Sequence, residues 1–89
     1  LFYLESVIKD RQKNPSEKSY TTKLFTKGVN KISQKVGEEA TETIIEALNG
    51  SRELLIEETG DLLYHLLVLL RAKDINFNEV LSVLKKRHE

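Results

Sequence analysis

Two pairs of acidic residues with helical spacing are the part of this sequence best suited to chemistry. Glu39 and Glu42 lie three residues apart, and Glu58 and Asp61 repeat that spacing later in the chain. At about 3.6 residues per helical turn, this separation places both members of a pair on one face of a helix. If the two helices are neighbours, four carboxylates converge, and a bound divalent cation would offset their mutual repulsion.

The second pair occupies an unusual position for acidic side chains. With a rotation of about 100° per residue, Glu58 and Asp61 fall inside the apolar stripe of their helix. Carboxylates are almost never fully buried unless they are paired or bound to a metal ion. A ligand set made only of carboxylates favours Mg²⁺, or Mn²⁺, over zinc. We therefore predict a metal site formed by Glu39, Glu42, Glu58 and Asp61, although the first pair alone would be typical of a solvated helical face.

A series of lysines precedes and overlaps the first acidic pair. Lys23, Lys27, Lys31 and Lys35 are spaced by four residues, although Gly28 interrupts the helix between the second and third. One interpretation is a solvated basic edge. The other is a set of cations that neutralise phosphate oxygens near the metal, as a polyphosphate substrate requires. Lys35 is the best candidate because it shares a face with the carboxylates.

Three ring side chains have both a structural and a functional interpretation. A histidine on an apolar face is more often a hydrogen-bonded core residue than a base or a ligand, and we predict the first role for His65. Tyr20 and Tyr64 could stack on a nucleotide base, but packing within the protein is the simpler expectation.

Length and composition set broad limits. A chain of 89 residues predicts one small domain, residues 1–89, whose core benefits from association. Fourteen basic residues balance fourteen acidic ones, so net charge gives no argument for nucleic acid or an anionic membrane. There is no cysteine and no apolar run of the ~20 residues needed to span a bilayer, so we expect a cytoplasmic protein. The chain begins at Leu1 without methionine, as expected of a piece of a longer protein.

The pattern of apolar residues predicts an all-α fold. A first helix is expected to end before Pro15, and a short one capped by Ser19 is expected to stop at Gly28 in the left-handed conformation. Two long helices, residues 29–48 and 52–73, should form a central antiparallel hairpin that brings the acidic pairs together. Asn76 and Glu79 have the spacing of a capping box for a last helix.

One segment carries more apolar surface than a single neighbour can cover. Residues 62–70 are apolar on nearly all sides, apart from Tyr64 and His65. We therefore expect a partner chain on this helix, so that the helical bundle dimerises into a larger one.

Three segments together resemble one known family. Residues 19–25 (Ser-Tyr-Thr-Thr-Lys-Leu-Phe), 35–40 (Lys-Val-Gly-Glu-Glu-Ala) and 61–70 (Asp-Leu-Leu-Tyr-His-Leu-Leu-Val-Leu-Leu) are similar to phosphoribosyl-ATP pyrophosphohydrolase. The resemblance covers nearly all 89 residues and joins the motif Glu-Glu-x-x-Glu then Glu-x-x-Asp to flanks particular to this family. Gly60 departs from the pattern, because a small residue such as alanine is expected there.

The resemblance implies both a fold and a reaction. The fold is that of the all-α nucleotide pyrophosphohydrolases related to MazG, which form helical-bundle dimers. The reaction is Mg²⁺-dependent hydrolysis of phosphoribosyl-ATP to phosphoribosyl-AMP and pyrophosphate, the second step of L-histidine biosynthesis. In some organisms the domain is fused to phosphoribosyl-AMP cyclohydrolase, and the start at Leu1 and the last four residues, 86–89, resemble the C-terminal half of that protein.

The site residues then take specific expected roles. The four carboxylates would hold one or two Mg²⁺ ions, and Glu38 would orient or deprotonate the attacking water. The phosphate-binding residues would be Lys23, Lys27, Lys31 and Lys35, with Lys35 acting closest to the reaction. Two rival hypotheses are a MazG-like enzyme for noncanonical nucleoside triphosphates and a catalytically silent helical dimerisation module.

Overall fold

The protein is all-helical in a computed structural model that describes all 89 residues. The helices are α1 (Phe2–Lys13), α2 (Tyr20–Lys27), α3 (Val29–Asn49), α4 (Arg52–Ala72) and α5 (Phe77–Arg87). The all-α prediction is confirmed, and the two long helices match their expected ranges to within one residue. None of the helices combines the length and apolar character that crossing a membrane requires.

Local sequence signals explain where the helices begin and end. The Ser19 and Ser51 side chains accept hydrogen bonds from the Thr22 and Leu54 amides at 3.1 and 3.2 Å, as helix N-caps do. Gly28 ends α2 as predicted, but with φ +91° and ψ −179° rather than the left-handed helical conformation. The difference arises because Gly28 also begins α3, where its carbonyl accepts a hydrogen bond from the Ile32 amide.

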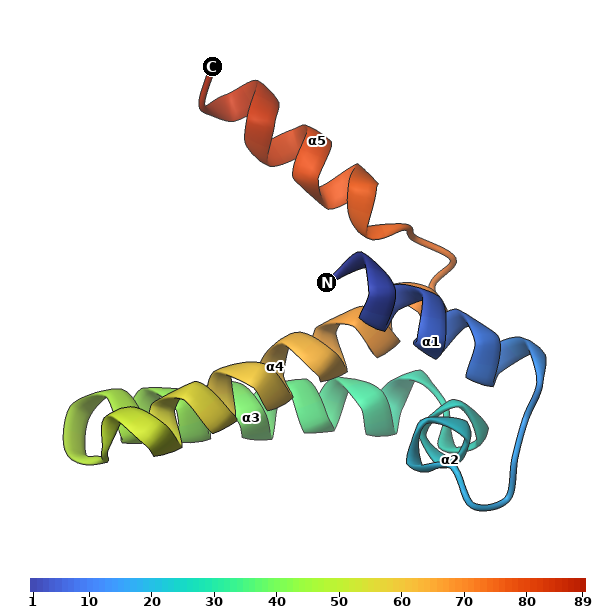
Figure 1. Cartoon of the computed structure of the whole chain (residues 1–89), viewed down its shortest axis with the longest axis horizontal. Helices are drawn as coiled ribbons and strands as arrows, with labels where there is room; N and C mark the ends of the chain where they lie inside the picture. Colours follow the sequence, from blue (N-terminus) through green and yellow to red (C-terminus); the bar gives the residue numbers. More distant parts are fainter.

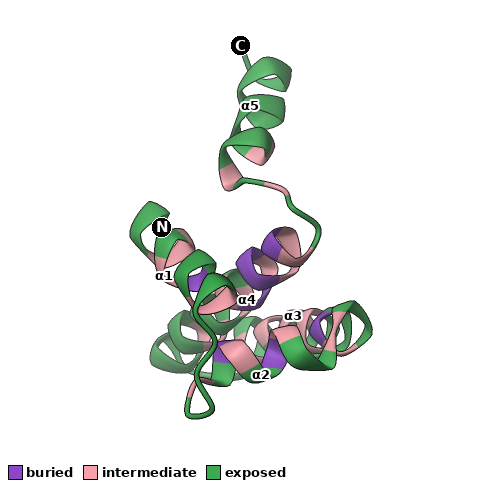
Figure 2. Cartoon of the chain, turned by 90° about the vertical axis from the view of Figure 1, so that its right-hand side faces the viewer, coloured by how far each residue is buried: buried purple, intermediate pink, exposed green.

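The two long helices organise the molecule. The chain reverses at Gly50 and Ser51, so that α3 and α4 lie side by side (Figure 1). Helices α1 and α2 pack against them at the end away from this reversal. Helix α5 projects away from the rest of the chain and has no buried residue (Figures 1 and 2).

The hydrophobic core occupies only one end of the long helices, where α1 and α2 cover them (Figure 2). It consists of Ile8, Leu24, Ile32, Leu67 and Val68. No residue from 33 to 64 is buried. The half of the α3–α4 pair nearest the reversal at Gly50 and Ser51 therefore lies wholly within a stretch that has no enclosed core in the single chain.

Large apolar side chains lie exposed on that coreless half. They include Ile44, Ile45, Leu48, Leu54 and Ile56, which are 45–76% exposed. The sequence placed the uncovered surface at residues 62–70, but Leu67 and Val68 are in the core there and Leu63 alone reaches 40% exposure among the large apolar residues. Helices α1 and α2 thus cover part of the second half of α4, and the partner chain expected on residues 62–70 stays a prediction.

The start of α5 is held by hydrogen bonds from two directions. The Glu79 carboxylate accepts from the Asn76 amide at 2.9 Å, which confirms the predicted capping box. The Glu5 carboxylate of α1 accepts from the Phe77 amide at 2.6 Å. Helix α5 is therefore held to α1 at its first turn, and its later turns project away from the other helices (Figure 1).

A substitution at Gly60 tests how α4 is packed. It lies inside α4, and a Cβ added there would meet no atom within 4 Å. We expect Gly60→Ala to stabilise the protein by roughly 0.5–1 kcal/mol, because glycine loses more backbone entropy than alanine in a helix. Thermal unfolding should show a rise of a few degrees. A fall would contradict the prediction and would indicate that another chain approaches Gly60 closely.

Candidate metal centre

Three of the four predicted metal ligands meet between α3 and α4. Glu39, Glu58 and Asp61 each offer a carboxylate oxygen, and these oxygens lie within 4.8 Å of one another. The side-by-side packing of the helices brings Glu39 opposite the other two, whose separation of three residues places them on one face. A cluster of this size can surround one small cation.

Glu42 is exposed and does not belong to that cluster of three. It lies beside Glu58 instead. A hydrogen bond with the Glu42 carboxyl, burial, and the nearby Glu39 raise the pKa of Glu58 to about 7. The fourth predicted ligand therefore borders the centre and contacts one of its members.

The cluster contains acceptors that the protein itself leaves unsatisfied. Glu39 Oε2 and Glu58 Oε2 are both buried, and neither has a hydrogen-bond partner. Buried carboxylate oxygens are unfavourable unless a donor or a cation satisfies them. The donor set is all oxygen, which fits Mg²⁺ or Mn²⁺ better than zinc. The residues present therefore fit the metal that the sequence predicted.

The burial of the α4 acids differs between the two residues. Glu58 is partly buried, whereas Asp61 is exposed. Both acids were predicted to lie inside the apolar stripe of α4, and Asp61 occupies a part of that stripe that neighbouring helices of the same chain leave exposed.

Glu38 points to its own helical neighbours rather than to the cluster. Its carboxylate accepts a hydrogen bond from Gln34 Nε2 at 2.7 Å and lies 3.5 Å from Lys35 Nζ. The Gln34 hydrogen bond and then the Lys35 charge lower the pKa of Glu38. Glu38 in turn is the main cause that raises the pKa of Lys35. The pair is thus a carboxylate and an ammonium, both charged, beside the centre.

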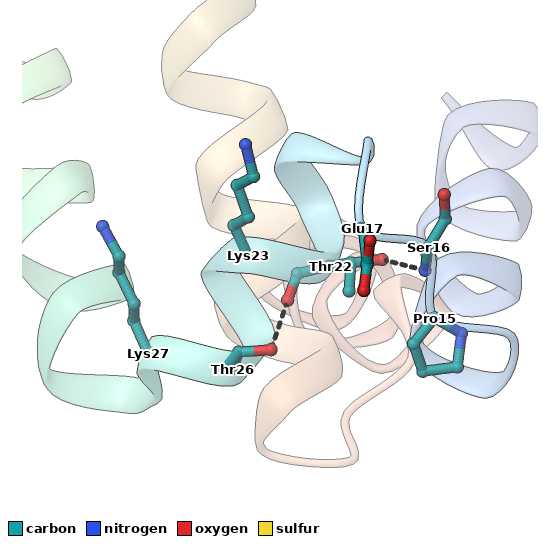
Figure 3. Close-up of a pocket in the computed structure, with 7 residues that line it drawn as sticks. All are labelled: Pro15, Ser16, Glu17, Thr22, Lys23, Thr26 and Lys27. Atoms are coloured by element: carbon teal, nitrogen blue, oxygen red, sulfur yellow. Dashed lines mark hydrogen bonds between the residues drawn. The ribbon is translucent and has the colours of Figure 1, made fainter.

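Two of the predicted phosphate-binding lysines lie on α2. Lys23 and Lys27 are both exposed and line a surface cavity of about 360 Å³ with the α1–α2 loop (Figure 3). Their side chains extend in the same general direction, and neither forms an ion pair. Lys31 is on α3 near Glu38, where its charge contributes to the lowered pKa of that carboxyl. The four lysines therefore divide between two helices, as the break at Gly28 requires.

Helix α2 is attached to α4 by contacts that the sequence did not predict. Tyr20 Oη lies 3.0 Å from His65 Nε2, and the Thr21 hydroxyl hydrogen-bonds to the Tyr64 hydroxyl. His65 is buried, as expected of a core histidine, and Tyr20 and Tyr64 stack on each other with ring centroids 6.1 Å apart. The sequence signal that could have indicated these contacts is that each helix carries two adjacent residues able to form hydrogen bonds, residues 20–21 on α2 and residues 64–65 on α4.

The raised pKa of Glu58 predicts a pH dependence in metal-free protein. A carboxyl with a folded-state pKa near 7 and an ordinary unfolded value stabilises the fold fully below about pH 4.5, and that stabilisation is lost as the pH rises to 7. We expect the melting temperature of the metal-free protein to fall across this range and Mg²⁺ to restore it near pH 7. Thermal unfolding of Glu58→Gln is the control. An equal pH slope in that variant would contradict the assignment to Glu58.

Comparison with known proteins identifies the family. The family model described as phosphoribosyl-ATP pyrophosphohydrolase matches residues 2–88. The chain belongs to the phosphoribosyl-ATP pyrophosphohydrolase family. A phosphoribosyl-ATP pyrophosphatase of Novosphingobium aromaticivorans is 52% identical over 84 residues, which are 94% of this chain and 78% of that protein.

Other members of the phosphoribosyl-ATP pyrophosphohydrolase family are longer. The histidine biosynthesis bifunctional protein HisIE of Buchnera aphidicola is 52% identical over 89 residues, which are all of this chain and 41% of that protein. The HisIE protein of Bacillus subtilis is 58% identical over 85 residues, which are 96% of this chain and 41% of that protein. The chain thus spans about two fifths of the length of these bifunctional relatives.

Proposed function

We propose that this chain catalyses the Mg²⁺-dependent hydrolysis of phosphoribosyl-ATP to phosphoribosyl-AMP and pyrophosphate, the second step of L-histidine biosynthesis. The observation that carries the proposal is the cluster of Glu39, Glu58 and Asp61, with its two unsatisfied buried oxygens, in a chain of this family. The relatives named phosphoribosyl-ATP pyrophosphatase supply the substrate class.

The carboxylates act by holding the cation. Glu39, Glu58 and Asp61 are its ligands, and Glu42 joins them either directly or through its contact with Glu58. Magnesium, when bound, neutralises phosphate charge at the anhydride bond that breaks. The pKa of Glu58 is raised to about 7, so cation binding would favour the ionised form of this carboxyl.

Glu38 and Lys35 act beside the carboxylate cluster. The lowered pKa of Glu38 makes it a weak base, so we propose that it orients the attacking water as a charged hydrogen-bond acceptor. Lys35, with a raised pKa, stays protonated and contacts the phosphates. Lys31 extends this positive charge along α3, and Lys23 and Lys27 extend it along α2.

We also propose that two copies associate through the coreless half of the α3–α4 pair. The exposed side chains at Ile44, Ile45, Leu48, Leu54 and Ile56 give this half an apolar surface. A single chain with five buried apolar residues has a small core for its length, and a two-fold interface would enlarge it. The metal centre lies within the same half, so the interface would also shield Asp61 from water.

The proposal also covers the cellular location and the domain content of the full-length protein. Relatives described as bifunctional support fusion to a phosphoribosyl-AMP cyclohydrolase domain in the full-length protein. We propose cytoplasmic activity, because the substrate derives from ATP.

One assay tests the proposed function directly. Pyrophosphate release from phosphoribosyl-ATP should require Mg²⁺ and should exceed release from ATP, dUTP and other nucleoside triphosphates. Preference for one of those nucleotides would favour a MazG-like housekeeping role. No release from any of them, together with no Mg²⁺ binding by calorimetry, would favour a dimerisation module.

A further inference from the structure

A surface cavity of about 360 Å³ lies between the α1–α2 loop and α2 (Figure 3). Apart from Pro15, every side chain that lines it is polar or charged, with two ammonium groups, three hydroxyls and one carboxylate. Its volume is at the lower end of the range typical of small-molecule sites. The cavity is therefore suited to a small ligand that carries both charge and hydroxyl groups.

Two hydrogen bonds orient the hydroxyl groups of the cavity. The Ser16 amide donates to Thr22 Oγ1 at 3.1 Å, which ties the loop to α2. Because the Thr22 hydroxyl accepts that bond, its own hydrogen is left to donate to a ligand. The Thr26 hydroxyl donates to the Thr22 carbonyl oxygen at 3.0 Å, so the Thr26 hydroxyl oxygen is left to accept. The cavity thus offers one hydroxyl as a donor and another as an acceptor.

The charged side chains of the cavity are separated by sign. In Figure 3, Lys23 and Lys27 extend from one side of the cavity, and Glu17 lies beside Ser16 on the other. Neither lysine forms an ion pair, so both ammonium groups are available to an anion. Two ammonium groups suit a phosphate monoester, and a carboxylate accepts hydrogen bonds from ribose hydroxyls. The arrangement matches a ribose that carries a 5-phosphate.

The two lysines also lie close to the side of α2 that faces the metal centre. At about 100° per residue, Lys23 and Lys27 fall within about 60° of Tyr20 around the helix. Tyr20 Oη is 3.0 Å from His65 Nε2, and His65 Nδ1 is 2.7 Å from the backbone carbonyl oxygen of Asp61. The cavity is therefore next to the helix face that contacts α4 beside one of the carboxylates. The two other surface hollows lie along α5, which projects away from the rest of the chain.

The proposed substrate carries phosphate at both of its ends. Phosphoribosyl-ATP differs from ATP by a ribose 5-phosphate group on the adenine ring, so the triphosphate is at one end and a phosphate monoester at the other. An enzyme that prefers it to ATP must contact the group that ATP lacks. In the proposed function the cation and Lys35 hold the triphosphate end. The other end then requires a second anion site.

We propose that the cavity between the α1–α2 loop and α2 binds the ribose 5-phosphate group of the substrate. Lys23 and Lys27 bind its phosphate, the Thr22 hydroxyl donates to it, and the Glu17 carboxylate accepts from the ribose hydroxyls. This inference rests on the proposed function, because it takes phosphoribosyl-ATP as the substrate. It makes the cavity the part of the protein that selects phosphoribosyl-ATP over ATP.

The two reaction products are probes that separate the cavity from the metal centre. Phosphoribosyl-AMP contains the ribose 5-phosphate group, whereas pyrophosphate with Mg²⁺ contains only the other end of the substrate. The double variant Lys23→Met/Lys27→Met removes both charges and keeps the apolar stems. We expect it to bind phosphoribosyl-AMP about ten- to a hundredfold more weakly than the wild type, the effect of losing charged hydrogen bonds. Its affinity for pyrophosphate with Mg²⁺ should stay within about twofold. Calorimetry measures both.

A charge-matched variant and a pair of small probes complete the test. Lys9→Met/Lys18→Met removes the same charge at exposed lysines outside the cavity, so it should bind both products as the wild type does. Glu17→Ala should weaken binding of ribose 5-phosphate several-fold without weakening binding of inorganic phosphate, because only the first has hydroxyls for the carboxylate. Circular dichroism and thermal unfolding establish that each variant is folded.

Specific outcomes would overturn the inference. A larger loss of affinity for pyrophosphate than for phosphoribosyl-AMP in Lys23→Met/Lys27→Met would place the two lysines at the triphosphate. Unchanged binding of phosphoribosyl-AMP by that variant, or equal affinity of the wild type for AMP and phosphoribosyl-AMP, would remove the cavity from the substrate site. These results leave the proposed function standing if the wild type hydrolyses phosphoribosyl-ATP. An inactive wild type in the presence of Mg²⁺ would instead overturn the proposed function itself.

Discussion

Replacing Asp61 with alanine is expected to abolish Mg²⁺-dependent pyrophosphate release while the helical fold survives. Asp61 is exposed, so its removal leaves no cavity and no unpaired buried group. It also removes one of three carboxylates whose oxygens lie within 4.8 Å of one another. We expect kcat/KM to fall by at least about a thousandfold, equivalent to ~4 kcal/mol of transition-state stabilisation. Glu39→Ala should behave in the same way.

Matched variants isolate the role of the metal. Asp61→Asn and Glu39→Gln keep the size of each side chain and remove only the charge, so their loss of activity should accompany a loss of Mg²⁺ affinity by calorimetry. Glu57→Gln is the control, because Glu57 is an exposed neighbour of Glu58 outside the cluster. Circular dichroism should report unchanged helicity in all of them. Full activity in Asp61→Ala or Glu39→Ala would refute the ligand assignment.

Replacing Leu48 with lysine is expected to convert the proposed dimer into monomers. Leu48 is 76% exposed in the single chain, so a lysine there can keep its charge in water and leave the monomer intact. In a two-fold interface each substitution occurs twice, and each buried ammonium would cost about 2 kcal/mol or more. Sedimentation velocity at micromolar concentration should report a dimer for the wild type and a monomer for Leu48→Lys.

A charge-matched control separates the interface from net charge. Ser6→Lys adds the same charge on α1, at an exposed polar position outside the apolar surface of the α3–α4 pair. It should remain a dimer. A monomeric wild type would contradict the proposed association, and a dimeric Leu48→Lys would place the interface elsewhere on the chain.

Helix positions and ligand candidates could be predicted from the sequence because they depend on local spacing. Ser19, Ser51 and the Asn76–Glu79 pair act as caps within one turn of a helix, so their effect is visible in the sequence. The separation of three residues within each acidic pair is local in the same sense. Gly28, the Asn49–Gly50 stop and the Ser51 cap likewise predicted the bounds of both long helices to within one residue.

The contacts between side chains on different helices were decided only by the tertiary structure. It brought Glu39 to Glu58 and Asp61 and left Glu42 at the edge, because the rotation of α3 about its axis is set by the packing of its neighbours. It also joined Tyr20 to His65, 45 residues away.

The sequence by itself thus determined an all-α chain with two acidic pairs at helical spacing, since backbone geometry and side-chain periodicity act within a single helix. Only the tertiary structure decided which apolar residues stay exposed. Within residues 62–70 of α4, Leu67 and Val68 are buried in the core, whereas Ile44, Leu48 and Ile56 near the reversal are more exposed than any apolar residue of that segment. The physical reason is that burial depends on which elements meet, and this follows from the packing of the whole chain.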